Sequence, residues 1–186
     1  MLVVLGYFGY GYFSNRSIMR MYSSAPMTNQ NVDSVVSFAY SGGAVNFNVP
    51  IGYEAKQLTS SSGLYIYIQK IGSNAFRIAP IQIQLLKSTE VDTFKGNFFS
   101  NILSKRILND ISVDGRQAVL LFEKDRPGAI GNPELWDNFI VAVEWPVTPG
   151  NGTLLVNMKT PEKTGFTNEQ VGAYKQIINS LHYISK

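Results

Sequence analysis

The sequence predicts an α+β domain in which helices pack on an antiparallel sheet. The first observation is a series of short stretches in which apolar and polar residues alternate, the period of a strand with one buried face. The second is a pair of stretches with apolar residues at helical spacing, which begin after Thr89 and after Thr167. The order is strands, helix, strands, helix, and such runs of strands favour an antiparallel sheet.

The strands are predicted from residue 45 onward. Residues 45–49 (VNFNV) alternate between apolar and polar, so one face is expected to be buried. Asp114 and Gly115 predict a tight hairpin turn, because this pair readily adopts the positive φ angles that such turns need. Residues 117–123 are apolar on both faces, which indicates a central strand. Further strands are predicted at residues 64–69, 81–85, 139–145 and 153–158.

The first predicted helix begins at Thr89, which is expected to act as N-cap with Asp92 three residues later. Its apolar stripe consists of Val91, Phe94, Phe98 and Ile102. Lys105 and Arg106 suit the negative end of the helix dipole, and Asn109 is expected to end the helix.

The second predicted helix begins at Thr167, where Gln170 completes a capping box. Its apolar stripe consists of Val171, Tyr174, Ile178 and Leu181. This stripe is expected to pack on the sheet. His182 is the only histidine of the chain, and we expect it in the last turn of this helix, where the dipole favours a positive charge.

The chain is expected to divide into three segments. Residues 1–13 carry no charge and are interpreted as the end of a truncated signal anchor, with a short signal-peptide core or a buried element of the fold as alternatives. Residues 14–43 are expected to form a flexible linker, and residues 44–186 a single α+β domain. The expected location is extracytoplasmic and membrane-anchored; Arg16 and Arg20, which follow the first segment, favour the cytoplasmic alternative.

Three short motifs span almost the whole predicted domain in a consistent order: residues 47–53 (FNVPIGY), 113–118 (VDGRQA) and 177–183 (IINSLHY). They resemble the opening strand and turn, the mid-domain turn and the closing helix end of PsbP/Mog1/DcrB-like domains. The resemblance implies an α-β-α sandwich around an antiparallel sheet. Such domains often lie outside the cytoplasmic membrane behind a signal or anchor. The resemblance implies no functional residue.

Composition limits the function classes. The formal net charge of +3 is too small to indicate a nucleic-acid partner. The chain has no cysteine, which excludes thiolate catalysis and cysteine-ligated zinc. No nucleophile motif accompanies His182. The protein is therefore expected not to be an enzyme and to use no cofactor.

A polar loop near residues 124–137 is the richest group of charged side chains. It is interpreted as a solvated surface loop or, alternatively, as an interaction loop, because irregular loops on a rigid scaffold often carry function. The residues expected to contact a partner are Lys124, Asp125, Arg126, Glu134 and Trp136. The residues that could supply oxygen ligands to calcium are Asp125, Asn132, Glu134 and Asp137.

The sequence therefore predicts a membrane-tethered or exported domain that binds a protein or a component of the cell envelope. Its contact surface is expected to comprise this loop and the edge strands. The alternative is a small-molecule or calcium-binding module of the same fold. Trp136, Phe139, Trp145 and Phe166 are expected in the core, and a ligand pocket lined by these aromatic residues is the alternative.

Overall fold

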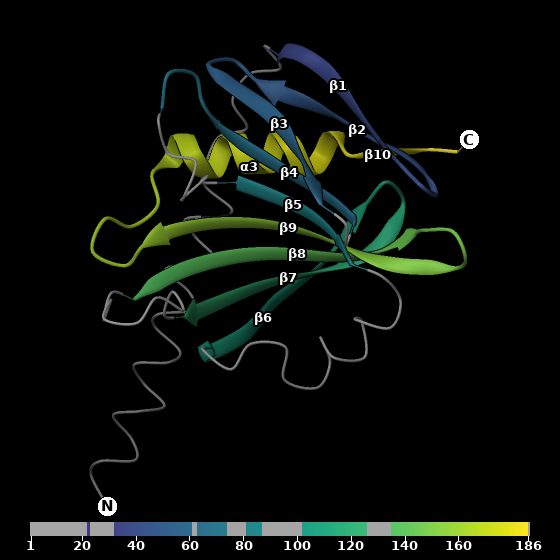
Figure 1. The fold of residues 1–186 in the computed structure, drawn as a ribbon. Helices are drawn as coiled ribbons and strands as arrows, with labels where there is room; N and C mark the ends of the chain where they lie inside the picture. Colours follow the sequence, from purple (N-terminus) through teal and green to yellow (C-terminus); the bar gives the residue numbers. More distant parts are fainter. Residues whose placement is uncertain are drawn as a thin grey trace, which may run out of the picture.

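The computed structural model describes residue 22 and residues 32–60, 63–73, 81–86, 102–125 and 135–185. Within these ranges the chain forms two antiparallel sheets and one long helix (Figure 1). The small sheet has the order β1-β2-β10. Its strands are β1 (Val32–Tyr40), β2 (Gly43–Pro50) and β10 (His182–Ile184).

The large sheet has seven strands in the order β3-β4-β5-β9-β8-β7-β6. They are β3 (Tyr53–Ser60), β4 (Gly63–Lys70), β5 (Ile81–Leu86), β6 (Ile102–Val113), β7 (Arg116–Asp125), β8 (Trp136–Pro146) and β9 (Asn151–Pro161). The helix is α3 (Asn168–Ser180). In the described ranges, no helix has the length and hydrophobicity needed to cross a bilayer.

The main core lies between one face of the large sheet and a second layer made of α3 and the inner face of the small sheet. The rings of Phe38 and Phe47 stack at 5.8 Å on that inner face. Tyr174 of α3 is fully buried, and its hydroxyl donates a hydrogen bond of 2.6 Å to the backbone carbonyl of Val156. The predicted packing of the helix on the sheet is confirmed.

The opposite face of the large sheet carries a second, smaller apolar cluster. It comprises Leu86, Leu121, Ile140 and Leu155. Strand β7 lies between β6 and β8 and contributes to both clusters, with Leu120 in the main core and Leu121 in the smaller one. This confirms the central strand predicted at residues 117–123.

Helix α3 begins as predicted. The Thr167 side chain accepts a hydrogen bond from the Gln170 backbone, and the Gln170 side chain accepts one from the Thr167 backbone. The helix ends at Ser180, however, because residues 182–184 join the small sheet as β10. The expectation that His182 lies in the last helical turn is wrong for this reason.

The first predicted helix is wrong at its C-terminal end. Residues 102–113 form β6, and Lys105 and Arg106 pair with residues of β7. Strand β7 has two edges, and pairing one of them with β6 outweighs the local helical spacing. Residues 87–101, where the same helix was expected to begin, lie outside the described ranges. What the structure describes is mostly antiparallel sheet with one helix, which is richer in sheet than a helix-flanked sandwich.

The linker prediction is wrong for residues 32–40, which form β1. Val36, Phe38 and Tyr40 of this strand pack against the main core, so β1 belongs to the folded body. Tyr22 also packs against the core. Residues 1–13, and therefore the anchor prediction, lie outside the described ranges.

Candidate functional site

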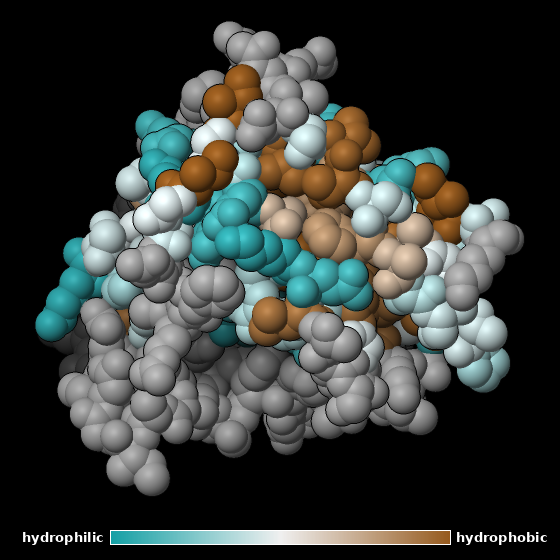
Figure 2. Space-filling model, turned by 45° about the horizontal axis from the view of Figure 1, so that its top comes forward, coloured by the Kyte–Doolittle hydropathy of each residue, from teal (hydrophilic) through white to brown (hydrophobic). Residues whose placement is uncertain are grey.

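Exposed apolar side chains occur at several places on the small sheet and around the β3–β4 hairpin. Among the side chains that the structure describes, the exposed large hydrophobic ones are Val35 (68%), Ile51 (59%), Leu58 (40%), Ile71 (60%) and Ile184 (43%). All belong to the small sheet, to the β3–β4 hairpin or to the turns beside them. Figure 2 turns this side of the molecule forward and shows brown apolar side chains beside a band of teal hydrophilic ones. Exposed apolar side chains that lie next to one another often mark a contact surface.

Ile51 and Ile71 lie on two adjacent turns. We call residues 51–52 and 71–72, which lie at the end of the β3–β4 hairpin opposite its loop, the hairpin tip. The Ile71 backbone N–H donates a hydrogen bond of 2.9 Å to the Gly52 carbonyl, which joins the two turns. Gly52 and Gly72 have φ angles of 80° and 79°, values that side-chain-bearing residues rarely adopt. The backbone that carries the two exposed isoleucines therefore has a defined conformation.

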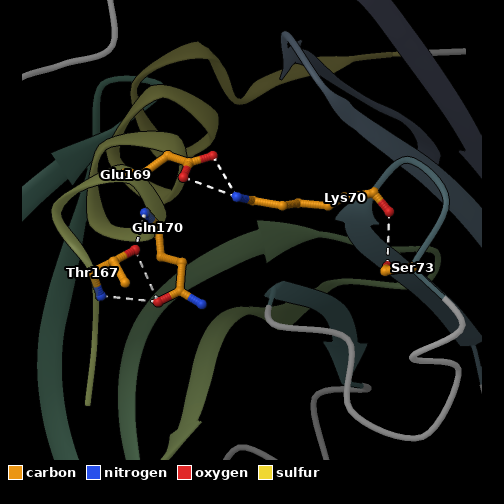
Figure 3. Close-up of polar contacts among 5 residues, drawn as sticks. All are labelled: Lys70, Ser73, Thr167, Glu169 and Gln170. Carbon is orange, nitrogen blue, oxygen red and sulfur yellow. Dashed lines mark hydrogen bonds and ion pairs between the residues drawn. The ribbon is translucent and has the colours of Figure 1, made fainter. Parts of the chain in front are cut away.

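The hairpin tip is tied to the start of α3. The Lys70 ammonium lies 2.7 and 2.8 Å from the two carboxylate oxygens of Glu169 (Figure 3). Glu169 sits in the first helical turn, beside the capping box that begins at Thr167. The backbone of Lys70 is also held, because the Ser73 hydroxyl donates a hydrogen bond of 2.7 Å to the Lys70 carbonyl. The exposed isoleucines thus stand beside a paired, solvent-accessible positive and negative charge.

Tyr53 lies directly behind the hairpin tip and is buried. Burial is the main cause that raises the pKa of Tyr53 to about 12, and the charge of Glu169 adds to it. Tyr53 also pairs with Lys70 across β3 and β4. A buried, uncharged tyrosine side chain therefore lies beside the hairpin tip.

The predicted interaction loop is described only at its two ends. Lys124 forms ion pairs with Asp137, at 3.7 Å, and with Glu162. Burial disfavours the charge on Lys124, but its two carboxylate partners outweigh this, so the pKa of Lys124 is raised. Trp136 is 6% exposed, as part of β8, so the expectation that a partner contacts it directly is not supported by its position. The side chain of Asp125, and Arg126, Asn132 and Glu134, lie outside what is described.

The calcium prediction can be compared with the structure only at Asp137. Its carboxylate faces the Lys124 ammonium, whose positive charge would oppose a nearby calcium ion. The described residues contain no group of three or more His, Cys, Asp or Glu side chains able to hold a metal ion. Calcium binding through Asp125, Asn132 and Glu134 stays a prediction.

The opposite end of the large sheet joins two of the three sequence motifs. Asp114 forms the predicted β6–β7 turn, with φ of 52°. Its carboxylate oxygens lie 2.7 Å from Nδ1 of His182 and accept a 3.0 Å hydrogen bond from the Tyr183 backbone N–H. The Arg116 guanidinium lies 5.7 Å from the Trp145 ring and 5.8 Å from the Tyr183 ring. These contacts hold β10 in place, and we assign His182 this structural role.

Three of the four aromatic residues considered as pocket candidates lie in the main core or pack against it. Phe139 and Trp145 are fully buried, and Phe166 packs on Phe139 with ring centroids 4.9 Å apart. The core prediction is confirmed for them. A hollow beside the β3–β4 hairpin is lined by Lys56, Leu58, Tyr67 and Gln69 and has a volume of about 10 Å³. That volume suits roughly one water molecule, so this hollow gives no support to small-molecule binding.

No family model and no curated protein match the chain. Among solved structures, the chain is similar to the Ran-binding protein Mog1p of Saccharomyces cerevisiae, with 12% identity, a TM-score of 0.47, and coverage of 83% of this chain and 97% of that one. It is also similar to a point mutant of the protein Mog1, with 11% identity, a TM-score of 0.46, and coverage of 82% and 97%. Mog1 is one of the families that the three motifs resemble.

Proposed function

We propose that this protein is a non-enzymatic binding domain that uses the hairpin tip to contact a protein partner. The observation that carries the proposal is the pair of isoleucines, each about three-fifths exposed, on turns that are hydrogen-bonded to each other. Fully burying one such side chain contributes about 1.5–3 kcal/mol. Two of them on a fixed backbone lose little entropy on binding, which favours a small contact of this kind.

The neighbouring charges suggest the chemistry of the partner surface. An interface commonly has an apolar centre and a polar rim. Here Ile51 and Ile71 would form the centre, and the Lys70–Glu169 pair would lie at the rim. The partner is therefore expected to offer an apolar pocket edged by hydrogen-bonding groups.

The test is affinity capture from cells that make the protein, with three forms of the full chain as bait. They are the wild type, the double variant Ile51→Ser with Ile71→Ser, and the control Ile184→Ser, which removes an exposed isoleucine elsewhere. Wild type and control should recover the same partner, and the double variant should lose it. Recovery of identical proteins by all three baits, or of none by the wild type, would count against the proposal.

We also propose that the domain is membrane-tethered or exported and that its partner is a component of the cell envelope. The support is the uncharged sequence of residues 1–13. Fractionation of cells that express the full chain should place it with the membrane or outside the cytoplasm, and removal of residues 1–13 should release it. A cytosolic pool of the full chain that the deletion leaves unchanged would contradict this part.

A further inference from the structure

Strand β1 forms one edge of the small sheet. Its inner neighbour β2 pairs with β1 on one side and with β10 on the other. Among the described strands, none pairs with the outer edge of β1. Ser34, Val35, Ser37 and Ala39 of this strand are exposed to solvent.

The register shows which backbone groups of β1 face outward. The Asn48 N–H of β2 donates to Ser180 Oγ at 2.9 Å, which places the even-numbered backbone groups of β2 away from β1. The odd-numbered residues Val45 and Phe47 therefore bond to their β1 partners, Phe38 and Val36.

Because the hydrogen-bonding direction alternates along a strand, the residues of β1 between these positions face the open edge. They are Val35, Ser37 and Ala39. Each offers one N–H and one C=O group to an incoming strand.

From Ser34 to Tyr40, the same strand lacks the features that usually protect an edge. Natural edges carry charged residues, proline or strong bulges that prevent pairing with another chain. Residues 34–40 (SVVSFAY) contain no charge and no proline, and the one irregularity in the pairing lies before them, between Val32 and Ser34. The side chains that accompany the outward backbone groups are small and neutral.

We propose that two copies of this chain pair through β1, in antiparallel orientation about a twofold axis at Ser37. Ser37 then lies opposite Ser37 of the other copy, and Val35 opposite Ala39, so that two small sheets become one sheet of six strands. A second copy fits because an antiparallel pair of identical strands is self-complementary. With no charge on residues 34–40, the symmetry sets no like charges against each other. The inference does not depend on the hairpin tip.

The test is analytical ultracentrifugation of the full chain at concentrations up to about 1 mM. Three forms are compared: the wild type, Ser37→Pro and Ser37→Ala. Proline removes the outward N–H of residue 37 without removing a bond to β2, whereas alanine keeps that N–H. Wild type and Ser37→Ala should form a dimer in a concentration-dependent way. Ser37→Pro should raise the dissociation constant of this dimer about tenfold or more.

Hydrogen exchange on the wild type provides a second test that needs no variant. The amides of residues 35, 37 and 39 should exchange more slowly as the protein concentration rises. A wild type that stays monomeric, a dimer that a folded Ser37→Pro variant retains, or exchange at these amides that does not change with concentration would each overturn the proposal.

Discussion

Gly152 is the residue with the least space around it among the described glycines. A Cβ atom there would lie 2.2 Å from the carbonyl oxygen of Leu86 and 3.0 Å from Cγ1 of Val147. The sequence indicates a turn at this position, whereas the structure places Gly152 inside β9, opposite Trp145. Only the pairing of β9 with β5 reveals why a side chain is excluded, since β5 and its residue Leu86 are distant in sequence.

Gly152→Ala is expected to destabilise the fold by about 3 kcal/mol, because the added methyl group meets backbone. Gly72→Ala provides the control, since it has open space but a φ of 79°, and it should cost about 1 kcal/mol. Urea unfolding measures both free energies. Equal costs, or a larger cost at Gly72, would contradict the packing described at Leu86.

The burial of individual residues is predicted well where the side chain is large and apolar. Phe139 and Trp145 are large and apolar and lie in the main core. His182 was predicted in the last helix but lies in β10. Its partner Asp114 is 68 residues away, and no local sequence pattern indicates that contact. Ile51 and Ile71 were not singled out, although each precedes a glycine beside the end of a strand, a pattern that indicates paired turns.

At the scale of elements, α3 was predictable because its capping box and apolar stripe are local in sequence. Strand β6 was not predicted, although the Asp114-Gly115 turn indicates a strand before it. A hairpin turn requires a strand on each side, so the residues before 114 should form a strand and not a helix. Strand β1 was missed because the exposed residues Val35 and Ala39 are themselves apolar, which obscures the alternation of Val36, Phe38 and Tyr40 with the outer face.

Thr167→Ala is expected to lower the free energy of unfolding by about 1 kcal/mol, because it removes the side-chain acceptor for the Gln170 N–H. Glu169→Gln, in the same turn, breaks only the exposed ion pair with Lys70 and should cost less than about 1 kcal/mol. Its effect should also fade at about 1 M salt, whereas the effect of Thr167→Ala should not. Urea titrations at low and high salt check both; a salt-independent loss for Glu169→Gln would contradict the assignment.

At the scale of the whole molecule, the two layers shelter several tyrosines from solvent. Burial is the main cause that raises the pKa values of Tyr22, Tyr40 and Tyr53 to about 12 each. Burial also raises the pKa of Tyr174 well above its ordinary value. Because the folded pKa values exceed the unfolded ones, this contribution to stability is complete below pH 10, the unfolded value, and is lost as the pH rises toward 12.

The free energy of unfolding is therefore expected to fall between about pH 10 and pH 12. Ultraviolet absorbance of tyrosinate, followed together with circular dichroism, measures this. In the folded protein a group of tyrosines should ionise only as the structure is lost, whereas in urea all ten should ionise near pH 10. Complete ionisation near pH 10 with an unchanged circular dichroism spectrum would contradict the two-layer packing.

The central claim is that the hairpin tip contacts a protein partner, and residue-resolved hydrogen exchange of the full chain with and without its captured partner tests it most directly. The account predicts slower exchange at residues 52–53 and 70–73 in the complex, with little change at the amides of β7 and β8. Protection confined to residues 124–137, or unchanged exchange at the tip in a complex that stays intact, would contradict it.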